Sequence, residues 1–162
     1  MRRAAIALAA LAFAGAAVAQ APQIPLEALK AAGLDPETQV ADGRLQLMTG
    51  QRAVIGLDEA GQPQLAQVEE TYKGTGAGRL AFALDASVEK RQSILKVWNG
   101  LTRPLAYEAE ITALRGGKLM KKASTICAVP AGAVGYEVWP DPVISVTLSK
   151  FAETPADQHV CQ

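Results

Sequence analysis

The stretch Leu105-Ala106-Tyr107-Glu108-Ala109-Glu110-Ile111-Thr112-Ala113 sets an apolar row at its odd positions against Glu108, Glu110 and Thr112. A period of two is typical of a β-strand with one buried face. Two further segments alternate in the same way: Arg79–Ala86, with Leu80, Phe82 and Leu84, and Val143–Lys150, with Ile144, Val146 and Leu148. These rows predict strands and most of the core, which we expect to consist of Leu80, Phe82, Leu84, Leu95, Val97, Tyr107, Ala109, Ile111, Ile144, Val146 and Leu148.

Turn residues separate the apolar segments at short intervals. Asp58-Glu59-Ala60-Gly61, Asn99-Gly100 and Gly116-Gly117 have the composition and length of hairpin turns, and prolines interrupt the chain at 130 and 140–142. Strands without alternating helices favour an antiparallel sandwich. We therefore predict an all-β fold, an antiparallel Ig-like β-sandwich of about seven to eight strands. Residues 85–95 could instead form a helical turn.

A short helix is expected near the N-terminus. Pro25 is followed by good helix formers, and Gly33 provides a stop. We therefore expect three parts of the chain: residues 1–19, an N-terminal segment 20–42 that contains the helix, and a sandwich domain 43–162.

Residues 1–19 have the order of a secretory signal peptide. Two arginines precede an uncharged run from Ala4 to Ala17, and Ala17-Val18-Ala19 is a small-residue cleavage site. A membrane anchor is the rival interpretation, but the run is shorter than the roughly 20 residues of a span. We predict cleavage after Ala19, a periplasmic or extracellular location, and no stable membrane insertion after the signal is removed.

The only two cysteines are Cys127 and Cys161. Paired thiols become disulfides in an oxidising compartment, so we predict that this pair tethers the C-terminal tail. A reactive thiol or a metal pair is the alternative, but the chain has no CxxC spacing and His159 is its only histidine. We expect no metal and no cofactor.

The charge balance argues against nucleic acid as a partner. The chain has 16 basic and 16 acidic side chains, whereas nucleic-acid binding needs a basic excess. The glycines of Gly74–Gly78 invite a nucleotide-loop interpretation, but a strand follows where that motif needs a helix. His159 lies in a proline-containing tail, where a rigidly held catalytic base is hard to build.

Carboxylates offer a route to hydrolysis without histidine. Glu108 and Glu110 share one face of a strand at about 6.6–6.8 Å, a separation that acid–base pairs can use. Glu137 and Asp141 are the other candidates. The alternative is that these acidic side chains are not catalytic, because acidic residues are common on a solvent-exposed strand face.

Two surface features could bind a partner. Arg115, Lys118, Lys121 and Lys122 surround the Gly116-Gly117 turn, where they could meet an anionic partner or protect an edge strand from pairing. Trp139, Pro140 and Asp141 could form an exposed binding ledge, although Trp139, like Trp98, could equally lie in the core.

Three segments carry a resemblance: Val97-Trp98-Asn99-Gly100-Leu101-Thr102-Arg103-Pro104-Leu105-Ala106-Tyr107, Ser124-Thr125-Ile126-Cys127-Ala128-Val129 and Glu137-Val138-Trp139-Pro140. Residues 94–151 resemble a family of small exported bacterial proteins to which no activity is attached, and more loosely Ig-like sandwiches. The resemblance implies export and a sandwich fold, and it carries over no catalytic residue.

Two functions remain open from the sequence. The first is a non-catalytic binding module of the bacterial envelope, whose partner is an envelope protein or a small ligand, because no acid–base–nucleophile set is evident. The second is a small carboxylate-dependent envelope hydrolase. The positions of Glu137 and Asp141 discriminate between them, since a hydrolase needs carboxylates that converge in a pocket.

Overall fold

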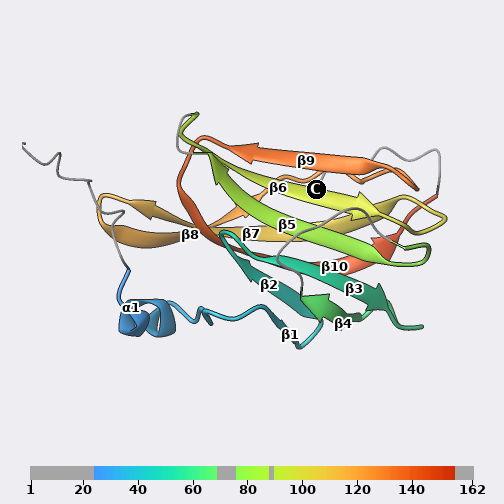
Figure 1. Cartoon of the computed structure of the whole chain (residues 1–162), viewed down its shortest axis with the longest axis horizontal. Coiled ribbons are helices and arrows are strands. Elements are labelled where there is room, and N and C mark those ends of the chain that lie inside the picture. Colours follow the sequence, from blue (N-terminus) through green and yellow to red (C-terminus); the bar gives the residue numbers. More distant parts are fainter. Residues whose placement is uncertain (1–23, 69–75, 88–89, 156–162) are drawn as a thin grey trace, which may run out of the picture.

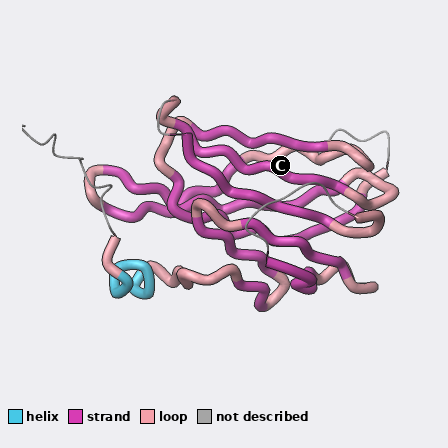
Figure 2. Tube along the Cα trace, in the orientation of Figure 1, coloured by secondary structure: helices cyan, strands magenta, loops and turns pink. Residues whose placement is uncertain are grey.

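The structure is a computed structural model that describes residues 24–68, 76–87 and 90–155. Its one described helix, α1 (Leu26–Ala31), lies at one end of the molecule (Figure 2). The strands are β1 (Gln39–Ala41), β2 (Arg44–Met48), β3 (Arg52–Leu57), β4 (Pro63–Val68), β5 (Leu80–Ser87), β6 (Gln92–Asn99), β7 (Leu105–Arg115), β8 (Lys118–Ser124), β9 (Val134–Trp139) and β10 (Val143–Glu153).

These strands form two five-stranded sheets in which every described pairing is antiparallel (Figure 1). One sheet has the order β1-β2-β10-β7-β8, and the other has the order β4-β3-β5-β6-β9. The all-β class and the sandwich-like arrangement are thus confirmed. The described strands number ten rather than seven or eight, because residues 39–48 add two short strands and residues 134–139 add a third, whose flanking glycine and proline had suggested turns.

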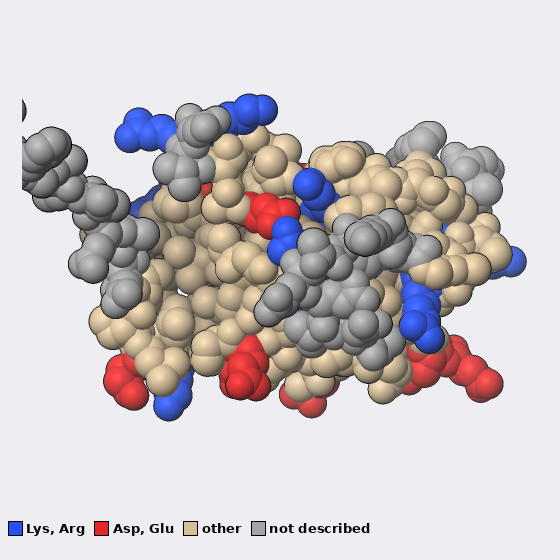
Figure 3. Space-filling view, in the orientation of Figure 1, with Lys and Arg blue, Asp and Glu red and all other residues tan. Residues whose placement is uncertain are grey.

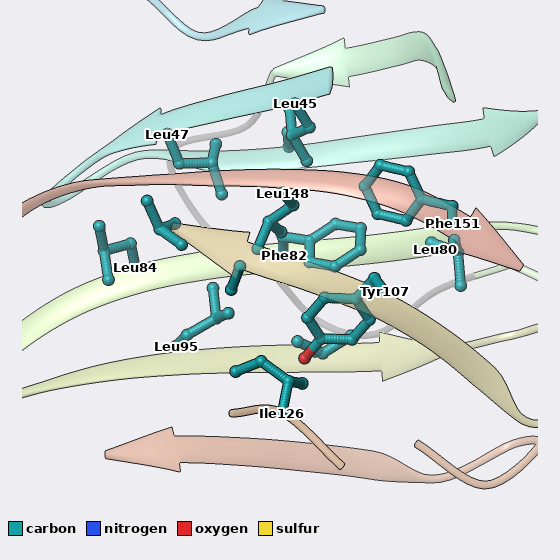
Figure 4. Close-up of a cluster of buried hydrophobic side chains, with 14 of the residues drawn as sticks. Leu45, Leu47, Leu80, Phe82, Leu84, Leu95, Tyr107, Ile126, Leu148 and Phe151 are labelled. Carbon is teal, nitrogen blue, oxygen red and sulfur yellow. The ribbon is translucent and has the colours of Figure 1, made fainter. Parts of the chain in front are cut away.

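The core lies between the two sheets and is built from their inward rows (Figure 4). The rings of Phe82, Tyr107 and Phe151 meet there with centroids 5.9–6.2 Å apart. Burial of such rings contributes both apolar area and favourable edge-to-face contacts. Ten of the eleven predicted core residues are buried.

The exception is Ile144, which is only half-buried. The pairing of β10 with β7 shifts between Val143 and Ser145, so that Ile144 is an extra residue on β10. A β-bulge of this kind changes which side chains face the core, and Val143 is buried instead. Residues 85–87 and 92–95 belong to the strands β5 and β6, so the helical alternative for that segment is wrong there.

Helix α1 forms where Pro25 and Gly33 predict it. Gly33 has φ +69°, a left-handed conformation that ends the helix and that glycine adopts without a steric penalty. The helix buries Leu29, and Ala28, Ala31 and Ala32 share a surface groove with Leu114 and Leu119 of the β7–β8 hairpin. Strand β1, from the segment 20–42, pairs with β2 and so joins the first sheet.

Candidate functional site

Strand β9 ends the second sheet, and its two faces are unusual. Its inner row consists of Gly135, Glu137 and Trp139, and its outer row consists of Val134, Tyr136 and Val138. We call the latter the β9 outer row. These three side chains are 39%, 60% and 53% exposed. An edge strand of a soluble protein normally turns its charge outward and its apolar residues inward, so β9 presents the opposite of the usual arrangement.

The backbone of the same three residues faces the unpaired edge. The Asn99 N–H donates to the Ala133 carbonyl at 3.0 Å, which places Ala133 among the residues that bond to β6. Because these groups alternate along an antiparallel strand, Gly135, Glu137 and Trp139 also bond toward β6. The N–H and C=O groups of the β9 outer row therefore point away from it, to a side where no described strand pairs.

A buried asparagine fixes the approach to β9. The Asn99 side-chain amide donates to the carbonyls of Arg103, Val129 and Pro130 at 2.9–3.2 Å. Its carbonyl accepts the Leu101 N–H at 2.9 Å. One side chain thus makes hydrogen bonds both to the turn after β6 and to the segment that leads into β9. These bonds give its own buried polar atoms the partners that they require.

Gly135 allows that segment to pass beneath β9. A Cβ built at Gly135 would lie 2.6 Å from Cγ2 of Val129, closer than two carbons can approach. Val129 is itself held by paired backbone hydrogen bonds to Leu105 at 2.9 Å. Residue 135 must therefore lack a side chain for Val129 to fill the core below it.

Glu137 is the charged member of the inner row. Partial burial raises the pKa of its carboxyl, and a hydrogen bond from the Cys127 backbone N–H offsets part of that rise. The carboxylate also acts on Tyr107, since burial first and the charge of Glu137 second raise the pKa of that phenol. The Tyr107 hydroxyl points toward Ile126 (Figure 4), and among the described residues it has no hydrogen-bond partner.

The predicted ledge Trp139, Pro140 and Asp141 is divided by the structure. Trp139 is buried, and its indole Nε1 donates to Ser124 Oγ of β8 at 2.8 Å. Pro140 is exposed and borders a shallow apolar pocket of about 500 Å³ together with Pro142. Asp141 binds Arg115 through both carboxylate oxygens, and this hydrogen bonding holds the pKa of Asp141 below its usual range.

The four candidate carboxylates do not all lie together. Glu108 and Glu110 line one surface groove on the outer face of the first sheet, where Lys150 binds Glu108 at 2.7 Å and Lys121 lies 3.6 Å from Glu110. Glu137 belongs to the inner row of the second sheet, and Asp141 lies in the turn before β10. No described pocket is lined by Glu137, and Asp141 shares its pocket with no second carboxylate.

The basic side chains of the β7–β8 hairpin are partly neutralised. Arg115 binds Asp141 and Lys121 lies against Glu110, whereas Lys118 and Lys122 are exposed along the edge strand β8. The position of these lysines is that of charges that protect an edge from pairing.

Several predicted features fall outside the described residues: His159, Cys161, Gly74 and the signal segment 1–19. Cys127 is exposed, and no free cysteine occurs in the described part of the chain, but its pairing with Cys161 stays a prediction. Gly76–Gly78 form a turn that leads directly into β5. Within residues 24–68, 76–87 and 90–155, no cluster of His, Cys, Asp and Glu could hold a metal ion. No described helix is long and apolar enough to cross a bilayer.

Comparison with known proteins yields no matching family, no matching curated protein and no matching solved structure. The inferences below therefore rest on the sequence and geometry of this chain.

Sequence reasoning missed the β9 outer row. The stretch Val134-Gly135-Tyr136-Glu137-Val138-Trp139 alternates, so it carries a strand signal. The usual rule would turn Val134, Tyr136 and Val138 inward and Glu137 outward. Proline and glycine around it instead suggested only turns.

Proposed function

We propose that this protein is an exported, non-catalytic interaction module of the bacterial envelope that binds an extended segment of protein along β9. The observation that carries the proposal is the β9 outer row, three large apolar side chains exposed on an edge strand. In strand addition, main-chain hydrogen bonds along a free edge provide affinity and alternate side chains provide specificity. Strand β9 offers both on the same three residues.

The proposal includes the export and the tether expected from the sequence. A signal peptide 1–19 would deliver the chain to an oxidising compartment, where Cys127 and Cys161 would form a disulfide. The exposed position of Cys127 supports this pairing, because a surface residue is accessible to the tail. The Ig-like character of the sandwich belongs to the same proposal, supported by connections that pass repeatedly from one sheet to the other.

A site-specific photocrosslinker tests the interaction in intact cells. It would replace Tyr136 on β9 or, as a matched control, Met120 on β8, whose exposure of 52% is comparable. We expect covalent adducts with protein from position 136 and few from position 120. Equal labelling from both positions, or none from position 136, would contradict the proposal.

The hydrolase alternative keeps two supporting observations: the raised pKa of Glu137, since general acids often have such a shift, and the groove that Glu108 and Glu110 share. Two features weigh against it: Glu108, Glu110 and Asp141 form ion pairs with Lys150, Lys121 and Arg115, and neither Glu137 nor Asp141 shares one of the described pockets with another carboxylate. Hydrolysis of glycan or peptide by the purified chain that is abolished in Glu137→Gln would replace the interaction module by an enzyme.

A further inference from the structure

We propose that the extended segment bound by β9 is β9 of a second copy of this chain, paired antiparallel with Tyr136 of one copy opposite Tyr136 of the other. This inference rests on the proposed function, because it names the partner of the same edge. Three properties of β9 select this partner and this register.

The first property is the direction of the backbone groups. The residues with outward N–H and C=O groups are Val134, Tyr136 and Val138, as the bond from Asn99 to Ala133 establishes. Centring the pair on Tyr136 places each Val134 opposite a Val138. All three residues of each copy then exchange both backbone hydrogen bonds with the other copy, which gives about six bonds in total. Moving the register by one residue would place outward groups opposite inward ones.

The second property is the symmetry of the side chains. The β9 outer row reads Val-x-Tyr-x-Val, which is the same in both directions about Tyr136. A two-fold interface needs a surface that complements itself, and an antiparallel pair of this row provides one. Valine meets valine and tyrosine meets tyrosine, so the 39%, 60% and 53% exposed side chains cover one another.

The third property is the placement of charge. With Tyr136 at the centre, each Glu137 lies opposite a Gly135, and the two carboxylates do not face each other. A shift that pairs Tyr136 with Val138 would set Glu137 directly against Glu137, which is unfavourable for like charges. Most acidic side chains visible on the face in Figure 3 gather along its lower rim, on the side of α1, β1 and β4 and away from β9.

Sedimentation equilibrium of the purified mature chain tests the pairing through a charge exchange. We expect the unsubstituted chain to dimerise with concentration. Val134→Lys and Val138→Glu should each weaken the dimer by at least about tenfold, because a charge would face a valine within the paired row. The double variant should recover most of the loss, since the new lysine of one copy faces the new glutamate of the other at both ends.

Matched controls separate the pairing from a general effect of charge. Met120→Lys and Met120→Glu change an equally exposed residue on β8 and should leave the association unchanged. Recovery in the double variant also excludes misfolding as the cause of the single losses. A chain that stays monomeric, or a dimer that all four single variants leave intact, would overturn the inference.

Cysteine substitution tests the register independently. Tyr136→Cys faces itself, at a Cα separation of about 5.5 Å that a disulfide can span, so we expect a covalent dimer. Val134→Cys alone should form none, whereas mixing it with Val138→Cys should form a mixed dimer. A monomeric chain whose position 136 still crosslinks to a different protein would refute the second copy and leave the interaction module standing. A monomer with no crosslink from position 136 would refute both.

Discussion

Strands β8 and β9 each end a sheet, and they face each other across one side of the sandwich, where Trp139 Nε1 bonds to Ser124 Oγ. Strand β8 carries Lys118, Lys121 and Lys122 along its edge, whereas β9 exposes two valines and a tyrosine and turns its glutamate inward. Lysines make an edge strand costly to pair because pairing would desolvate them. The difference teaches that, within the described strands, one edge is protected from pairing by charge and the other carries no such protection.

The contrast depends first on Asn99, which fixes the chain before β9. Asn99→Ala would remove the side-chain donor to three carbonyls, of which those of Val129 and Pro130 keep a backbone N–H partner, and we expect a loss of about 2–3 kcal/mol in the free energy of unfolding. The control is Lys122→Ala on β8, which should cost less than about 0.5 kcal/mol because its side chain is exposed. Urea denaturation followed by circular dichroism measures both. Equal losses of unfolding free energy in Asn99→Ala and Lys122→Ala would contradict the special role of Asn99 in holding the chain before β9.

The next largest effect is expected at Gly135. Gly135→Ala would force a methyl group to within 2.6 Å of Val129, and overpacking of this kind costs about 1–3 kcal/mol. Val129→Ala removes the obstructing methyl groups, so the double variant should lose less than the sum of the two single losses. Additive losses in urea denaturation would mean that Val129 does not limit position 135.

Glu137 tests the comparison further, because it is the charged residue of β9 whose side chain lies on the inner face of the sheet. Its pKa is raised in the folded state, so the folded chain holds this proton more tightly than the unfolded chain. The stability that this contributes is fully present below the ordinary glutamate pKa of about 4.3 and is lost as the pH rises through the raised value. Glu137→Gln should therefore raise the urea midpoint at pH 7 relative to the unsubstituted chain, and the difference should disappear in acid. A gain that is independent of pH would contradict this cause.

The smallest effect is expected for the ion pair between Arg115 and Asp141. The pKa of Asp141 is lowered chiefly by the hydrogen bond from Arg115, so its contribution is present above the ordinary aspartate pKa and is lost as the pH falls through the lowered value. Asp141→Asn should lower the melting temperature slightly at pH 7, and less at high salt, because exposed pairs are screened. An effect that is equal at low and high salt would indicate a packing role instead.

Local chemistry made much of the fold predictable. The alternation of Leu105–Ala113 is legible because its apolar and polar residues separate cleanly between two faces. Proline at the start and glycine at the end predicted α1, and Gly116-Gly117 predicted the β7–β8 hairpin. Ile144 departs from its expected place because the bulge between Val143 and Ser145 depends on pairing with β7 and not on neighbouring residues.

The candidate site was harder to predict, since its decisive feature is the orientation of one strand. An alternating sequence defines two rows, but it does not say which row faces inward when both contain apolar residues. In β9, contacts with residues outside the strand determine which row faces inward. Val129 leaves room only for glycine at position 135, and Ser124 Oγ accepts the hydrogen bond from the Trp139 indole.

Strand pattern and turn positions thus follow from composition and period, because these are properties of short stretches of chain. The exposure of Val134, Tyr136 and Val138 follows from contacts between segments that are separate in sequence. Burying Trp139 against β8 and closing β9 over Val129 place Glu137 inside and the β9 outer row outside, and no local propensity carries that information.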